Sequence, residues 1–276
     1  MKSIRSSATV EILTIGNEIL TGEILDSNTN WLCKLVHSRG GTVVRVTILP
    51  DELNTIADAV REALLRKVDI LFTTGGLGPT ADDLTLQAIA AGTDREVELH
   101  PKALDMVRAQ YEHFSSHGKP LHGGITPARK KMAHLPQKAE PLFNSAGIAP
   151  GVSLKAKQTT IIALPGVPCE QKAIVNQSLQ QFLDQSFGEG SSLSRRLAVN
   201  CGGESVIEPV LTSISYKYPE IYTKSLAHAI GENADLDIVM TITGIGEKEP
   251  LLNRAFKELC SEISALGFSV TTKETD

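Results

Sequence analysis

The chain has 276 residues, of which 41% are hydrophobic and 21% are charged, so it is long enough for one large or two modest globular domains. Its formal net charge of −5 argues against a broad nucleic-acid-binding surface, which normally needs a basic face. No apolar run approaches the roughly 20 residues that span a bilayer, and the N-terminus lacks the apolar core of a signal peptide. Four widely spaced cysteines indicate free thiols. We therefore expect a cytoplasmic protein that binds neither nucleic acid nor membrane.

The first third of the chain alternates between two kinds of apolar pattern. Short apolar runs at 9–16, 42–49 and 69–76 predict buried strands, and amphipathic stretches at 30–41 and 50–68 predict helices between them. Strands and helices that alternate at this spacing favour parallel strands joined by right-handed crossovers. The sequence therefore predicts an α/β fold with a mostly parallel sheet.

The stretch "TTGGLGPTADDLTL" at 73–86 joins the third strand to a helix that we expect to begin at about Asp83. Gly75, Gly76 and Gly78 allow a close approach to the backbone, and the free N–H groups of a helix start favour an anion. Ligands of open α/β sheets bind beyond the carboxyl ends of strands. We interpret this stretch, with Thr80, as a phosphate-binding loop; a plain tight turn is the alternative.

Acidic residues follow each of these three strands. A helix cap explains one of Asp82 and Asp83, but a second acid beside a phosphate loop suggests a divalent cation. Glu18 follows the first strand, and Asp51 follows the second. Because the carboxyl ends of parallel strands open on one edge of a sheet, we expect these acids to converge on the glycine-rich loop.

The rest of the chain repeats some of these signals. Helices are expected at 100–114 and 126–136, and the second is basic, so that Lys130 and Lys131 are either partners of an anionic ligand or a solvated face. A small-residue turn at 144–152 precedes a strand at 159–166 and a helix at 167–183. The Gly/Ser-rich stretch 184–196 predicts a boundary between a domain at 1–185 and a small α+β domain at 195–276.

Several motifs occur in order between residues 15 and 171, namely "GNEILTGEILDSNTNWL", "GGLGPTADDLT", "ARKKMAHLP", "NSAGIAPGV" and "LPGVPCEQ". With these motifs the chain resembles the CinA family of competence- and damage-inducible proteins, within the molybdopterin-binding-domain superfamily. It is most similar to stand-alone archaeal-type members that lack the C-terminal deamidase domain. The resemblance implies a three-layer α/β/α domain followed by a small KH-like domain, and a homo-oligomer, with a dimer favoured.

The resemblance implies two different functions. One is the metal-dependent hydrolysis of the pyrophosphate in ADP-ribose or a related dinucleotide, with Mg²⁺, Mn²⁺ or Co²⁺ as the cation. The other is the non-hydrolytic binding of molybdopterin or a nucleotide. Two aspartates that are important in the molybdenum-cofactor proteins match Asp51 and Asp83. The chain departs from its relatives at Leu77, where the "GGTG" loop has Thr, and at Asn17, where many CinA proteins have Asp.

We therefore assign Glu18, Asp51 and Asp83 as candidate catalytic residues. Candidate metal ligands are Asp51, Asp82 and Asp83. The candidate residues for binding phosphate or ribose of a nucleotide substrate are Gly75, Gly76, Gly78, Thr80, Asn28, Lys130, Asn144 and Ser145.

Overall fold

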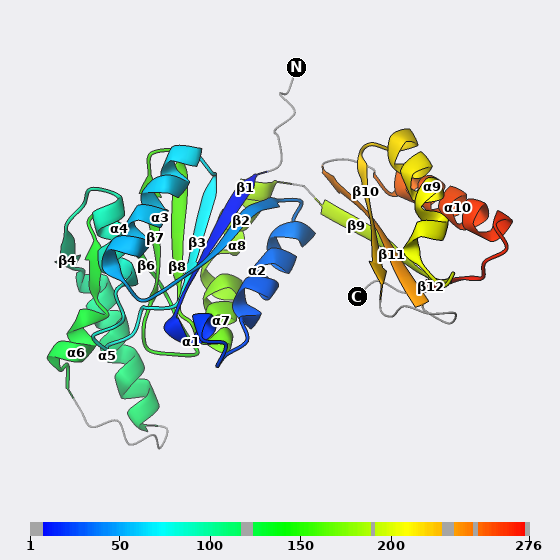
Figure 1. The fold of residues 1–276 in the computed structure, drawn as a ribbon. Coiled ribbons are helices and arrows are strands. Elements are labelled where there is room, and N and C mark those ends of the chain that lie inside the picture. The colour runs from blue at the N-terminus through cyan, green and yellow to red at the C-terminus, as the bar shows by residue number, and fades with distance from the viewer. Residues whose placement is uncertain (1–7, 117–123, 189–190, 228–234, 245–247, 274–276) are drawn as a thin grey trace. The chain divides into compact units, whose positions relative to one another are not determined.

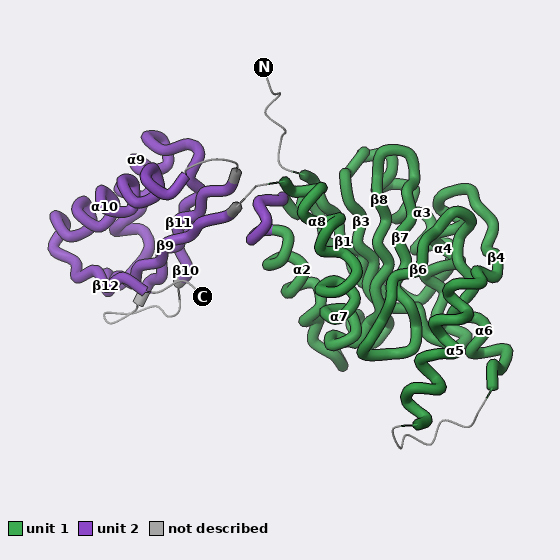
Figure 2. The backbone as a smooth tube through the Cα atoms, turned by 180° about the vertical axis from the view of Figure 1, so that it is seen from behind, with its two compact units in different colours: residues 1–36, 42–188 green, residues 37–41, 189–276 purple. Residues whose placement is uncertain are grey.

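The computed structural model describes residues 8–116, 124–188, 191–227, 235–244 and 248–273. The chain divides into two compact units, one made of residues 1–36 and 42–188 and the other of residues 37–41 and 189–276 (Figure 2). The division falls inside the Gly/Ser-rich stretch at 184–196. Within the described part of the chain, no helix is both long and apolar enough to cross a membrane.

The first unit is built on a six-stranded sheet with the strand order β2-β1-β3-β8-β7-β6 (Figure 1). Four strands are parallel: β1 (Thr9–Ile15), β2 (Thr42–Leu49), β3 (Ile70–Thr74) and β8 (Thr159–Leu164). Two further strands, β7 (Gly151–Ala156) and β6 (Glu140–Leu142), pair antiparallel at one edge. The mostly parallel sheet predicted from the sequence is therefore confirmed.

Helices cover both faces of this sheet because successive side chains of each strand point to opposite sides. On one face, Leu13 of β1 and Leu71 of β3 belong to a core that includes residues of α3 (Leu53–Arg66), α4 (Thr85–Gly92) and α5 (Pro101–Ser116). On the other face, Ile12 and Phe72 belong to a core with α2 (Ser27–Ser38), α7 (Pro168–Ser178) and α8 (Gln180–Phe187). The three layers expected from the resemblance are confirmed.

Short elements lie outside these layers. They are α1 (Asn17–Leu20), α6 (Pro127–Lys131) and an antiparallel pair formed by β4 (Val97–Leu99) and β5 (His134–Pro136). The sequence had predicted one helix over 126–136; it ends at Lys131, and the residues that follow it pair with β4. The Thr126 hydroxyl accepts a hydrogen bond from the Arg129 N–H and so caps α6.

The helix after the glycine-rich loop begins at Thr85 and not at Asp83, as the sequence had suggested. The Thr85 hydroxyl donates a hydrogen bond to the Gly75 carbonyl oxygen at 2.8 Å. The Thr85 backbone N–H donates to the Gly76 carbonyl oxygen at 3.2 Å. These bonds fold the loop back onto the helix start. No side chain caps α4, so the prediction that Asp82 or Asp83 serves as its cap was wrong.

The strand order places a topological switch between β1 and β3. The chain leaves β1 toward β2 on one side, whereas it leaves β3 toward the elements that lead to β8 on the other side. The two loops that follow β1 and β3 therefore diverge and leave a crevice at the carboxyl ends of the strands, which is where open α/β sheets bind ligands.

The second unit is a separate α+β domain. Its elements are β9 (Ser191–Asn200), α9 (Glu204–Lys217), β10 (Ile221–Ala227), β11 (Asp235–Gly244), α10 (Glu249–Ala265) and β12 (Val270–Lys273). The antiparallel strand order β10-β11-β9-β12 makes the domain implied as KH-like a βαββαβ plait. Its core joins Leu197 and Ile238 of the sheet to Ile214 and Leu259 of the helices. The α+β class predicted for this part is confirmed.

Candidate functional site

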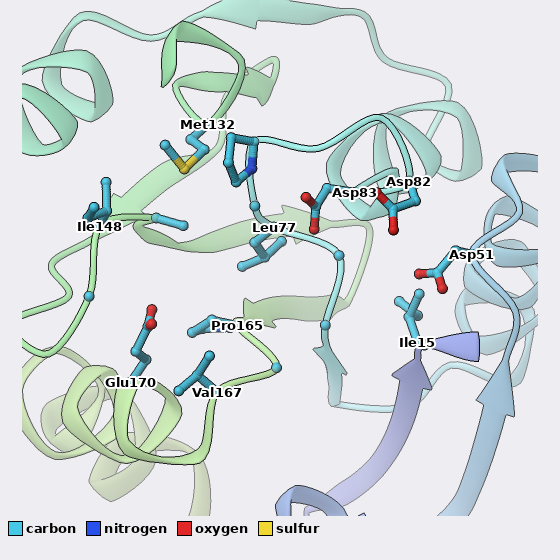
Figure 3. A pocket seen from close by; sticks show the side chains of 18 of the residues that line it. Ile15, Asp51, Leu77, Asp82, Asp83, Met132, Ile148, Pro165, Val167 and Glu170 are labelled. Carbon is cyan, nitrogen blue, oxygen red and sulfur yellow. The ribbon is translucent and has the colours of Figure 1, made fainter. Parts of the chain in front are cut away.

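A pocket of about 580 Å³ lies at the carboxyl ends of the parallel strands (Figure 3). Residues that follow β1, β2, β3 and β8 all line it. The acids predicted to converge here do so, because Glu18, Asp51, Asp82 and Asp83 are all lining residues. Gly75, Gly76 and Gly78 also line the pocket. The parallel order of the strands thus brings together side chains that are far apart in the sequence.

The glycine-rich loop has no room for side chains at its first two positions. Gly75 has a φ of +100°, and a Cβ atom added to it would lie 2.1 Å from the carbonyl oxygen of Ile15. Gly76 has a φ of +67°, and its Cβ would lie 2.2 Å from the Thr85 hydroxyl oxygen. Both positions require glycine for backbone conformation and for space. The loop can therefore lie directly against the end of β1 and leave its backbone open to the pocket.

Thr80 organises the two acids of this loop. The Thr80 N–H donates to Asp83 Oδ2 at 2.8 Å, and the Thr80 hydroxyl lies 2.6 Å from Asp83 and 2.5 Å from Asp82. The hydroxyl has one proton and donates to one carboxylate at a time. Its hydrogen bond is the main cause that holds the pKa of Asp82 below its usual value, and the Lys131 ammonium adds to the effect. Thr80, predicted to bind phosphate, does not line the pocket but orients these acids.

Asp51 and Glu18 approach from the other strand ends. The Asp51 carboxylate accepts a hydrogen bond from the Asn17 N–H at 2.9 Å, which ties the end of β2 to the first turn of α1. The Glu18 carboxylate lies over Gly16, where a Cβ atom would come within 2.5 Å of it. Figure 3 shows Asp51, Asp82 and Asp83 on the same side of the pocket. This side is therefore strongly acidic.

Glu170 lies at the other side and was not among the residues assigned from the sequence (Figure 3). It comes from the first turn of α7, within the motif "LPGVPCEQ", so the glycine turn that precedes it was the available signal. Burial raises the pKa of the Glu170 carboxyl, and a hydrogen bond that it accepts from Asn144 Nδ2 at 2.7 Å partly opposes that rise. Asp82 and Glu170 are thus the two acids of the pocket whose pKa is shifted, and the shifts have opposite directions.

The Asn144 side chain forms its hydrogen bonds within the protein. Its side-chain amide donates to the Ala149 carbonyl oxygen at 2.8 Å as well as to Glu170, and its oxygen accepts the N–H groups of Ala146 and Gly147. Both polar atoms of this buried side chain are therefore used in holding the loop and Glu170. Asn144 was predicted to contact ribose or phosphate, but it does not line the pocket, and neither does Ser145.

Two further predicted residues also lie outside this pocket. The Asn28 amide donates to the Gly166 carbonyl oxygen at 2.6 Å, and Asn28 lines a neighbouring pocket of about 370 Å³. The Lys130 side chain is exposed and does not line the main pocket. The cation close to the glycine-rich loop is Lys131, whose ammonium donates to the Thr80 carbonyl oxygen. A helix turns by about 100° per residue, so neighbouring lysines point in different directions.

Comparison with known proteins establishes the family. Residues 11–185 match the family of the probable molybdopterin binding domain. This chain belongs to that family. A protein of Aeropyrum pernix is 40% identical over 214 residues, which are 78% of this chain and 77% of the relative. A protein of Sulfurisphaera tokodaii is 34% identical over 262 residues, or 93% and 94% of the two chains.

A solved structure supports the same conclusion. The crystal structure of the protein CinA from Thermoplasma acidophilum, described as being of unknown function, is 30% identical to this chain and superposes with a TM-score of 0.58. The match covers 64% of this chain and 98% of that protein. The resemblance to CinA proteins predicted from the motifs is therefore confirmed for this member of the molybdopterin-binding-domain family.

The acids of this CinA-like pocket fit only one kind of metal site. Among the residues with described positions, no group of three or more His, Cys, Asp or Glu side chains is arranged to hold a metal ion. Asp82 and Asp83 are nonetheless adjacent and are oriented by the same hydroxyl. Mg²⁺ is commonly held by one or two carboxylates together with substrate phosphates. The donor set therefore fits a cation that is completed by a phosphorylated ligand, and not a fully protein-bound ion.

Proposed function

We propose that this chain is a metal-dependent nucleotide pyrophosphatase that hydrolyses ADP-ribose or a related dinucleotide. One observation carries the proposal: acids from three strand ends and an open glycine-rich loop line a single pocket. The volume of about 580 Å³ lies within the range of 300–1,000 Å³ that is usual for small-molecule sites. Glycines and carboxylates in one crevice suit a diphosphate that is accompanied by a cation.

In this proposal the residues of the pocket bind the diphosphate and the cation. The diphosphate would lie along the glycine-rich loop, and Asp83, with Asp82 or Asp51, would hold a divalent cation together with phosphate oxygens. When bound, this cation neutralises the diphosphate and activates the attacking water. The Thr80 N–H and the Asn17 N–H keep Asp83 and Asp51 in place.

Glu18 is the candidate general base. It takes a proton from the water as the water oxygen bonds to one phosphorus atom, and the P–O bond to the bridging oxygen breaks. The bridging oxygen leaves with the other phosphate and takes up a proton. The products from ADP-ribose are AMP and ribose 5-phosphate.

The test is an incubation of purified protein with ADP-ribose and Mg²⁺, Mn²⁺ or Co²⁺, with AMP measured by chromatography. We expect AMP with at least one of these ions and none after the metal is removed with EDTA. Asp83→Asn keeps an oxygen that accepts the Thr80 N–H and should lower the rate by about 100-fold or more. The matched control is Asp105→Asn, an exposed acid of α5 that pairs with Arg108. A folded wild-type protein that forms no AMP with any ion contradicts the proposal.

Non-hydrolytic binding of molybdopterin or a nucleotide is the second candidate. The observation that favours it is the lack, among the described residues, of a ready-made group of metal ligands. The family's description as a probable molybdopterin binding domain agrees with it. Mass spectrometry of the material released when the purified protein is denatured separates the two candidates. An intact pterin in stoichiometric amount, together with no AMP formation, supports binding alone.

A further inference from the structure

The two sides of the main pocket differ in chemistry. The side that holds Asp51, Asp82 and Asp83 is acidic, whereas the side near Glu170 is mostly apolar (Figure 3). In Figure 3 the hydrophobic residues on that second side are Met132, Ile148, Pro165 and Val167, and Leu77, Tyr111 and Phe114 also line the pocket. The Arg129 guanidinium lies 3.8 Å from the centre of the Tyr111 ring and so helps to fix it. Aliphatic side chains with two aromatic rings in the same pocket suit a planar heterocycle.

Glu170 is the polar group of this apolar side. Its Oε2 atom accepts the hydrogen bond from Asn144, whereas Oε1 has no hydrogen-bond partner among the described residues. No basic side chain within the described ranges forms an ion pair with it. In Figure 3 its carboxyl group points into the pocket, toward Ile148. A carboxyl oxygen in such surroundings is stabilised when a ligand brings an N–H donor to it.

The orientation of Glu170 is set by the protein before any ligand arrives. Asn144 holds Oε2 and at the same time holds the loop at 146–149. Gly147 in that loop leaves space for the carboxyl group, since a Cβ atom there would lie 2.1 Å from the carboxyl carbon of Glu170. A group that is positioned in advance loses little entropy when it binds, which favours selectivity.

We propose that the apolar side of the pocket binds the heterocyclic base of the ligand, and that Glu170 accepts a hydrogen bond from the exocyclic amino group of that base. The inference rests on the proposed function, which places the diphosphate at the glycine-rich loop. Adenine carries this amino group at C6, and the 2-amino-4-oxo ring of guanine and pterins carries it at the equivalent of C2. Hypoxanthine has no exocyclic amino group.

The experiment is equilibrium binding of ADP, GDP and IDP by titration calorimetry in EDTA, so that no turnover contributes. The three nucleotides share ribose and diphosphate; IDP lacks the 2-amino group of GDP and has a 6-oxo group in place of the 6-amino group of ADP. We expect wild type to bind ADP or GDP at least about tenfold more tightly than IDP, as a charged or polar hydrogen bond is lost with IDP. A preference for ADP assigns the site to adenine, and a preference for GDP assigns it to a 2-amino-4-oxo ring.

Variants separate recognition from structure. Glu170→Ala should bring the affinities for the three nucleotides within about threefold of each other, mainly by weakening the preferred one. Glu170→Gln keeps an acceptor oxygen and should retain part of the preference, so it serves as a second variant if the alanine protein unfolds. Glu140→Gln, on the exposed edge strand β6, is the matched control and should behave as wild type.

Each outcome decides the proposal. Equal affinities of wild type for the three nucleotides overturn it, as does an equal loss for all of them in Glu170→Ala. If none of the three binds, this inference is contradicted, and the proposed function is judged by AMP formation alone. A preference for the amino group without hydrolysis of ADP-ribose supports this inference and contradicts the proposed pyrophosphatase activity. Hydrolysis without such a preference supports the activity and contradicts this inference.

Discussion

Gly75 is held against Ile15 so closely that a Cβ atom on Gly75 would lie 2.1 Å from the Ile15 carbonyl oxygen. Backbone hydrogen bonds hold both residues in place. The Gly75 N–H donates to the Leu164 carbonyl oxygen at 3.0 Å, and Ile15 ends a strand that pairs on both sides. This contact therefore fixes where the glycine-rich loop leaves the sheet.

Gly75→Ala should destabilise the first unit by roughly 2–5 kcal/mol, because a left-handed φ and a backbone overlap both oppose the new methyl group. The matched control is Gly22→Ala, since Gly22 has a φ of +78° but no atom within 4 Å of the added Cβ. That control should cost only about 1 kcal/mol. Urea unfolding of both variants measures the difference. Equal losses would mean that the contact with Ile15 contributes nothing.

Glu11 and Arg66 give a second test of stability. Glu11 is 1% exposed within β1 and accepts hydrogen bonds from Arg66 Nε at 2.6 Å and Nη2 at 2.8 Å. Glu11→Gln should cost roughly 2–4 kcal/mol because it removes the charge from a two-point contact inside the sheet. Glu62 also pairs with Arg66, at 3.2 Å, but is exposed, so Glu62→Gln should cost less than about 1 kcal/mol. A similar cost for both variants would contradict this account.

Asn144→Ala should destabilise the first unit by about 2–4 kcal/mol, since it leaves the Ala146 and Gly147 N–H groups and the Ala149 carbonyl oxygen without their partner. Ser145→Ala is the neighbouring control and should change the free energy of unfolding by less than about 0.5 kcal/mol. Chemical denaturation measures both. A neutral Asn144→Ala would show that the loop at 144–149 keeps its shape by other means.

Glu170 makes stability depend on pH in a defined direction. Burial raises its pKa in the folded protein above the value of about 4.3 that is usual for glutamate. The folded state therefore binds this proton more strongly than the unfolded state does, so the contribution of Glu170 to stability is present at low pH and is lost as pH rises through the raised pKa.

Glu170→Gln removes this titration. The free energy of unfolding of the variant, minus that of wild type, should therefore increase as the pH is raised from 4 to 7. Unfolding curves over this range measure the difference, and Glu140→Gln provides the comparison for an exposed glutamate. A difference that stays constant or decreases with pH would contradict a raised pKa.

The sequence contained enough information for the strands and for one side of the pocket. Each parallel strand is a mostly apolar run that ends near glycine or proline, and the carboxyl ends of β1, β2 and β3 fix where the acids that follow them lie. For this reason Glu18, Asp51 and Asp83 were placed correctly relative to one another. The antiparallel strands β6 and β7 were missed because their pairing depends on tertiary contacts and not on a local pattern.

The apolar side of the pocket was harder to predict. Tyr111 and Phe114 have a spacing that fits a helix packed on a core equally well, so nothing in the pattern directs them to a ligand. A turn asparagine such as Asn144 can bond either a ligand or its own loop, and only the folded geometry decides between them. The bound cation, the hydrolysis, the homo-oligomer with a dimer favoured, and the cytoplasmic location stay predictions.

The place of β8 in the sheet has a consequence for how the molecule is made. This strand (Thr159–Leu164) pairs with β3, yet many residues of chain separate the two. A nascent chain that has been translated as far as α6 already contains Asp51, Asp82, Asp83 and the glycine-rich loop. It does not yet contain β8, which pairs with β3 and precedes Pro165, Val167 and Glu170 of the pocket. Until β8 is made, the edge of β3 that includes Leu71 and Phe72 has no partner strand. Termination of translation before Thr159 should therefore yield an aggregation-prone fragment that depends on chaperones.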